Sequence, residues 1–176
     1  MDTHDLNVRL RQLRSEHFLA AARMAASTSG RSADDLLKIY ERDLARTEKV
    51  AQVGAFVNDQ LIGFGRVVWV EIEAFQVNRA PNGWYLLGVN VLSAFQRRGI
   101  ATLLTNWRID WFADRADDLF YVATPTNVAS IRLHEALGFV KAQENVFMPP
   151  SLDGLTLFSR RSKSGAVDQT RTSAPS

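Results

Sequence analysis

The sequence contains no cysteine among its 176 residues, which excludes disulfides, thiolate nucleophiles and cysteine-ligated zinc. It has three histidines, and two of them, His4 and His17, lie near the amino terminus, so no metal site is expected. No apolar run is long enough to cross a membrane, and residues 1–10 lack the apolar core of a signal peptide. We therefore expect a cytoplasmic protein with no metal ion and no membrane contact.

The sequence also has little net charge, because 21 Lys and Arg residues against 19 Asp and Glu residues leave +2. Residues 161–176 account for this excess, since Arg161, Lys163 and Arg171 stand there against Asp168. Residues 1–160 are therefore neutral overall, which argues against a nucleic-acid-binding protein. The polar, small-residue-rich end from 161 to 176 is expected to be disordered, either as a solvated tail or as a weak contact for polyanions. This leaves residues 1–160 as one domain.

Hydrophobic periodicity and turn residues predict an alternation of strands and helices. Strands are expected at 7–13, 50–57, 61–72, 84–92, 118–123, 139–143 and 154–159. Helices are expected at 15–26, 32–44, 100–113 and up to 137, with Ser32 capping the second helix and either Thr126 or Asn127 capping the fourth. Hairpins in the middle of the chain and strand–helix alternation after it indicate an α/β fold with a mixed sheet.

A basic turn, FQRRGIATLL at residues 95–104, joins a predicted strand to a predicted helix. A helix N-terminus offers unpaired backbone N–H groups and a partial positive charge, which together suit a phosphate. Gly99 allows a tight turn and a close backbone approach, Arg97 and Arg98 add positive charge, and Thr102 offers a hydroxyl. The spacing alone leaves two interpretations open: a pyrophosphate site, or a strand-to-helix turn with solvated arginines.

Two stretches resemble the GNAT superfamily of acyl-CoA-dependent N-acetyltransferases. VLSAFQRRGIATLL is similar to motif A, whose core Gln/Arg-x-x-Gly-x-Gly/Ala reads Gln96-Arg97-Arg98-Gly99-Ile100-Ala101 here. NVASIRLHEALGF is similar to the next motif, Asn-x-x-Ser-x-x-Leu-Tyr-x-x-x-Gly-Phe, and matches it at Asn127, Ser130, Leu133, Gly138 and Phe139. The resemblance implies a mixed, mostly antiparallel sheet of about seven strands flanked by about four helices.

The resemblance also implies a co-substrate, acetyl-CoA. The family binds the pyrophosphate with backbone amides of the basic turn, which correspond here to Arg97, Arg98, Gly99, Ile100, Ala101 and Thr102. It binds the pantetheine arm and the thioester along the preceding strand, here Val89, Asn90 and Val91. Asn127 and Ser130 are expected to line the same groove.

His134 stands where the family motif has a tyrosine, the usual general acid. Asn127, Ser130 and His134 are spaced i, i+3 and i+7, so they share one helix face. A histidine with an ordinary pKa of about 6.5 suits proton donation near neutral pH. His134 is therefore the candidate general acid, and the alternative is a solvent-facing residue that replaced a dispensable tyrosine.

The family commonly takes its general base from a carboxylate on the central strands, yet residues 84–92 contain none. Glu71 and Glu73 are the nearest carboxylates, at the end of the preceding strand. Their i, i+2 spacing puts them on one sheet face, as candidate bases or as a solvated strand end.

Two functions from different classes remain open. The first is an N-acetyltransferase whose acceptor is a primary amine on a small molecule, a protein N-terminus or a lysine; the protein is a monomer or a homodimer. The resemblance places the acceptor site between residues 15–47 and the loop 73–83, whose mixed charges do not identify the amine. The second is a CoA-binding sensor without turnover, which the missing tyrosine and the missing strand carboxylate favour.

Overall fold

The computed structural model describes residues 6–73, 77–149 and 152–162. Its strands are β1 (Arg9–Gln12), β2 (Val50–Val57), β3 (Gln60–Val70), β4 (Gly83–Val91), β5 (Asp118–Ala123), β6 (Val140–Met148) and β7 (Leu152–Arg161). Its helices are α1 (Ser15–Ser29), α2 (Ala33–Asp43), α3 (Ile100–Phe112) and α4 (Val128–Ala136), with a short 3-10 turn, η2, at Ser93–Phe95. No helix in the described part of the chain is both long and apolar enough to cross a lipid bilayer.

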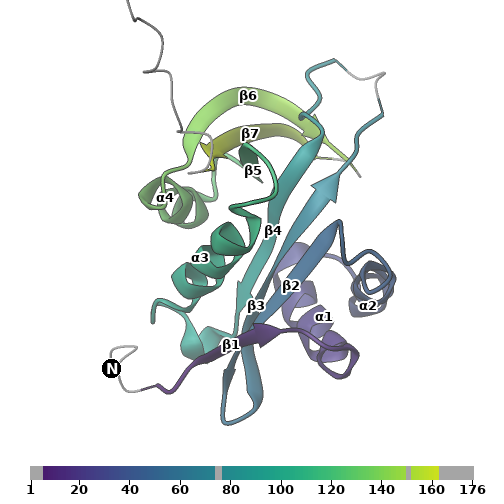
Figure 1. Cartoon of the computed structure of the whole chain (residues 1–176), viewed down its shortest axis with the longest axis vertical. Helices are drawn as coiled ribbons and strands as arrows, with labels where there is room; N and C mark the ends of the chain where they lie inside the picture. The colour runs from purple at the N-terminus through teal and green to yellow at the C-terminus, as the bar shows by residue number, and fades with distance from the viewer. Residues whose placement is uncertain (1–5, 74–76, 150–151, 163–176) are drawn as a thin grey trace, which may run out of the picture.

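The strands form one seven-stranded sheet in the order β1-β2-β3-β4-β5-β7-β6. Neighbouring strands run antiparallel except β4 and β5, which are parallel, so the predicted mixed and mostly antiparallel sheet is confirmed. α1 and α2 cover one face of the sheet, and α3 and α4 lie on the other (Figure 1). Each face of the sheet therefore packs against its own pair of helices (Figure 1).

Helix α1 is longer than predicted, because it continues through Ser27 and Thr28 to Ser29. The hydroxyls of Ser27 and Thr28 donate hydrogen bonds to carbonyls one turn back, which lets these polar residues stay helical. Gly30 ends the helix in the left-handed conformation, with φ of 68°. The predicted cap of α2 is confirmed, since the Ser32 hydroxyl accepts a hydrogen bond from the Asp35 backbone N–H.

The final two strands also extend beyond the predicted ranges, and this moves the end of the domain. β7 includes Arg161, and Ser162 is 5% exposed with its N–H donated to the Asp117 carbonyl. The expected tail from residue 161 is therefore wrong for Arg161 and Ser162, which belong to the fold because β5 pairs with β7 up to Arg161. The rest of the expected tail lies outside the described residues.

Strands β4 and β5 separate soon after they meet. Their ladder within the described chain consists of two pairs, Trp84–Leu119 and Tyr85–Phe120. Farther along β4, the register with β3 shifts opposite Gly65, and Gly88 takes a positive φ of 54°, which marks a β-bulge. The edge of β4 that faces β5 is thus left without a strand partner, and backbone groups along it are free to bind a ligand.

Candidate active site

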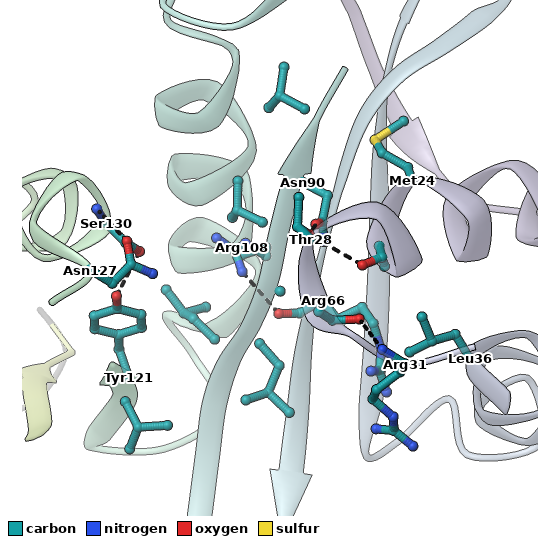
Figure 2. A pocket seen from close by; sticks show the side chains of 18 of the residues that line it. Met24, Thr28, Arg31, Leu36, Arg66, Asn90, Arg108, Tyr121, Asn127 and Ser130 are labelled. Atoms are coloured by element: carbon teal, nitrogen blue, oxygen red, sulfur yellow. Dashed lines mark hydrogen bonds between the residues drawn. The ribbon is translucent and has the colours of Figure 1, made fainter. Parts of the chain in front are cut away.

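A cavity of about 550 Å³ lies where β4 and β5 separate. Side chains from both layers of helices line it, as do β3, β4 and β5 (Figure 2). They are Met24, Ala25, Thr28, Ser29, Arg31, Leu36, Tyr40, Arg66, Leu86, Leu87, Gly88, Val89, Asn90, Val91, Gln96, Arg108, Tyr121, Val122, Asn127, Ser130 and His134. A ligand in this cavity can therefore pass from one face of the sheet toward the other.

The basic turn reaches this cavity at Gln96, which lines it, while the residues from Arg97 to Thr102 are not among the lining residues. Gly99, the residue before the first turn of α3, has a φ of 74° and no side chain to cap the helix. The first turn also contains no acidic residue, so its backbone N–H groups have no local anion. Arg97 takes the left-handed conformation with φ of 60°, which is uncommon for a non-glycine residue and typical of a functional turn.

A hydrogen bond from Gln96, the first residue of the motif core, holds the basic turn against β4. The Gln96 side chain donates a hydrogen bond to the Val91 carbonyl over 3.0 Å. This contact fixes the loop against the strand end, so the N-terminus of α3 opens beside the β4 edge. Arg97, Arg98, Gly99, Ile100, Ala101 and Thr102 thus form the turn and the first turn of the helix, as predicted.

The predicted strand segment lines the cavity. Val89, Asn90 and Val91 all contribute to its wall, just after the bulge. The Asn90 side chain accepts a hydrogen bond of 2.8 Å from the Thr28 hydroxyl of α1, which ties the cavity wall to the helix on the opposite face (Figure 2).

The predicted face of α4 also lines the cavity, with Asn127, Ser130 and His134 all in its wall. The Asn127 side-chain oxygen accepts the Ser130 N–H and caps the helix, which leaves its amide NH₂ available to a ligand. The i, i+3, i+7 spacing therefore predicted correctly which residues of α4 meet the groove.

The environment of His134 differs from the predicted one. His134 is 2% exposed, and its ring stacks on the Tyr121 ring with centroids 3.6 Å apart. Its Nδ1 donates to the Ser130 carbonyl over 2.8 Å, while the buried Nε2 has no hydrogen-bond partner among the described residues. Burial lowers the pKa of His134 to about 4, so the imidazole is neutral at physiological pH. The expectation of an imidazolium acid with an ordinary pKa is wrong, because the charged ring would be desolvated.

Tyr121 was not among the predicted site residues, yet its hydroxyl reaches the cavity wall. It donates a hydrogen bond of 2.6 Å to the Ser130 hydroxyl (Figure 2). Burial raises the pKa of Tyr121, so the phenol keeps its proton at neutral pH. The sequence offered no signal for this role, because an aromatic residue within a strand reads as core.

The predicted bases, Glu71 and Glu73, do not line the cavity. Glu71 follows the end of β3 and pairs with Lys49, its carboxylate 2.9 Å from the ammonium nitrogen. The hydrogen bonds from Lys49 and from the Trp69 indole lower the pKa of Glu71 and hold it as a carboxylate on the surface. Glu73 is exposed as well. The structure therefore does not bring either predicted base into the cavity wall.

The charged side chains that line the cavity are arginines. Arg31, Arg66 and Arg108 line it, and no Asp or Glu of the described residues does. Arg66 forms an ion pair with Asp43, which is 3% exposed at the end of α2. None of the three arginines was a predicted site residue, since arginines usually lie in solvent.

Residues 10–139 match the model of the acetyltransferase (GNAT) family. A comparison with curated protein sequences gives no match. Many solved structures are similar. The protein yncA of Salmonella typhimurium, determined with its cofactor acetyl-CoA, has a TM-score of 0.70 at 17% identity, covering 93% of this chain and 99% of its own. The ribosomal-protein-S18-alanine N-acetyltransferase of Escherichia coli has a TM-score of 0.68 at 17% identity, covering 94% and 99%.

Arabidopsis thaliana NAA60, in complex with a bisubstrate analogue, has a TM-score of 0.66 at 14% identity, covering 89% of this chain and 99% of its own. At these identities the three structures show a shared fold. The family model, by contrast, spans both motifs, the basic turn and the opened strand pair. The chain therefore belongs to the GNAT family of acetyltransferases.

Proposed function

We propose that the protein is an N-acetyltransferase that moves an acetyl group from acetyl-CoA to a primary amine. One observation carries this proposal: a cavity bounded by the free edge of β4 reaches Gln96, and the basic turn and the uncapped N-terminus of α3 follow Gln96 directly in the chain. Such a helix end suits a pyrophosphate, and a free strand edge suits an amide-containing arm. The two features lie in the order in which acetyl-CoA presents its phosphates and its pantetheine.

The residues of the site fit acetyl-CoA. Backbone N–H groups from Arg97 to Thr102 would hold the pyrophosphate, and Val89 to Val91 would hold the arm. The buried Nε2 of His134 has no partner in the described protein, and it suits an N–H or S–H donor of the ligand. When bound, acetyl-CoA supplies an activated thioester, whose C–S bond breaks as the amine takes the acetyl group.

Proton delivery falls to Tyr121 rather than to His134. The neutral imidazole donates its one N–H to the Ser130 carbonyl and has no second proton to give. Tyr121 donates to the Ser130 hydroxyl, which leaves the serine proton free to point into the cavity. A proton can therefore pass from Ser130 to the leaving sulfur while Tyr121 replaces it.

The acceptor amine would lose its proton to water, since no carboxylate of the described residues lines the cavity. Three cavity arginines disfavour a second positive charge and lower the pKa of an amine bound beside them. This environment favours a single primary amine over a polyamine. Backbone N–H groups at the β4 bulge would stabilise the developing oxyanion.

A second candidate is a CoA-binding sensor without turnover. It is supported by the lack of any carboxylate base among the described residues of the cavity wall. Both candidates require acetyl-CoA binding, so turnover alone separates them.

The test is a thermal-shift titration with acetyl-CoA, run beside a thiol-release assay against amino acids, monoamines, polyamines and peptides. We expect a cofactor-dependent shift and thiol release with at least one monoamine or peptide. A shift without release from any acceptor class would favour the sensor, and the absence of a shift would overturn both.

A further inference from the structure

Arg108 is a charged residue in the interior of the protein. It lies on α3 and is 1% exposed. Its Nη1 donates to the Arg66 carbonyl over 3.1 Å (Figure 2). Its Nε donates to the Leu104 carbonyl, and its Nη2 donates to the Thr105 hydroxyl over 2.8 Å. All three acceptors are neutral groups. The hydrogen bonds therefore give each guanidinium nitrogen a partner but do not balance the positive charge of Arg108.

No carboxylate of the described residues forms an ion pair with Arg108. Burial lowers the pKa of Arg108 to about 9, which still leaves the guanidinium charged at neutral pH. A buried charge without a counter-ion is costly, and such charges are normally paired or in contact with a ligand. Arg108 lines the cavity, so a bound anion is its available partner.

The fold provides a specific place for this side chain. A Cβ at Gly65 would lie 3.0 Å from Arg108 Nε, so the glycine makes room for the guanidinium against β3. The β4 bulge lies opposite Gly65. Arg108 is thus held beside the bulge, where backbone groups are placed to meet the thioester.

The position of Arg108 along α3 narrows the identity of the anion. It follows Ile100 by eight positions, which is about 12 Å along the helix axis from the phosphate-binding end. Between the phosphates and the sulfur, the pantetheine arm carries no charge. The sulfur becomes anionic when the C–S bond breaks, because both bonding electrons remain on it until a proton arrives. We propose that Arg108 binds the thiolate form of CoA and stabilises the leaving group by its charge.

Other groups facing Arg108 do not supply that charge. Tyr121 of β5 is the titratable group whose field acts on Arg108, and it keeps its proton at neutral pH. His134 of α4 is neutral there, partly because the Arg108 charge opposes its protonation. The Arg66 guanidinium of β3 is already paired with Asp43. This inference rests on the proposed use of acetyl-CoA, and it adds a residue for stabilising the leaving group.

The test compares the binding of free CoA and of desulfo-CoA, which lacks the thiol, by calorimetry from about pH 6 to about pH 9. Both ligands carry the same phosphates and meet the same His134 and Tyr121. The ratio of their affinities therefore removes pH effects that arise from these groups. If Arg108 stabilises the thiolate, the affinity ratio of CoA to desulfo-CoA should rise about tenfold or more with pH, since a nearby opposite charge lowers a pKa by about one unit or more. Ultraviolet absorbance of bound CoA reports the thiolate directly.

Arg108→Met should flatten this ratio, and Arg108→Lys should restore part of the rise because it keeps the charge. If Arg108→Met does not fold, the test rests on the pH dependence of the affinity ratio in the wild type and in Arg108→Lys. If CoA binds but its affinity ratio to desulfo-CoA stays flat with pH in the wild type, the inference is overturned. It is also overturned if the ratio rises equally in Arg108→Met, and an anion on the acceptor would then be the partner of Arg108. Absence of CoA binding altogether would overturn the proposed function and this inference with it.

Discussion

His134 makes the stability of the protein depend on pH in a predictable way. Its imidazole is buried against Tyr121, and its folded-state pKa is about 4, below the ordinary value of about 6.5. As the pH falls between these values, the unfolded chain takes up a proton that the folded protein excludes. The free energy of unfolding must therefore fall as the pH is lowered through this window.

The size of the effect follows from the two pKa values. At about pH 7.5 neither state is protonated at this site, and the difference is close to zero. At about pH 5 most unfolded molecules carry the proton and most folded molecules do not, so His134 lowers the free energy of unfolding by about 2 kcal/mol.

Urea unfolding of the wild type at the two pH values measures the total change, to which other groups also contribute. His134→Phe preserves an aromatic ring against Tyr121, and His134→Gln preserves a donor for the Ser130 carbonyl; neither residue titrates. Each variant should lose less stability than the wild type on acidification, by about 2 kcal/mol. The same pH dependence in all three proteins would show that His134 is not protected from protonation, and the reasoning would fail.

Gly99→Val should weaken acetyl-CoA binding about tenfold or more in a thermal-shift titration, because the branched side chain strains the basic turn at φ of 74°. Gly154→Val, at φ of 71° with no atom near its added Cβ, is the matched control, and equal losses would refute the assignment of the turn. Tyr121→Phe should lower turnover by about 10²-fold while acetyl-CoA affinity holds; unchanged turnover would remove the tyrosine from proton delivery. Asp43→Asn should lower the free energy of unfolding in urea by about 3 kcal/mol, because it leaves a largely buried arginine unpaired, and a loss below about 1 kcal/mol would count against that pair.

Local features of the fold were predictable because they depend on neighbours in the sequence. Ser32 and Asn127 cap helices as short polar side chains do, and Gly99 takes the positive φ expected of a glycine in this turn. Strand β2 was predicted to the residue from its apolar run. The family resemblance implied that Asn127 and Ser130 line the groove, and helical spacing put His134 on the same face of α4.

Boundaries were less predictable where a distant partner decides them. β7 extends through Arg161 because β5 offers hydrogen bonds that far, and no local residue signals this. α1 continues past its expected end, where the Thr28 hydroxyl donates to the Asn90 side chain of β4, 62 residues away. A hydrogen bond that forms only in the folded protein thus outweighs the weak local preference of these residues for a turn.

The sequence by itself determined the family, the order of elements, the basic turn and the residues of α4 that face the groove. The tertiary structure decided the chemistry of the cavity, because charge and pKa depend on burial and on residues far apart in the chain. Pairing with Lys49 holds Glu71 as a carboxylate at the surface, and burial keeps His134 neutral. The separation of β4 from β5 opens the cavity, and the glycine at 65 admits Arg108 beside it, an interior charge that a helical pattern cannot reveal.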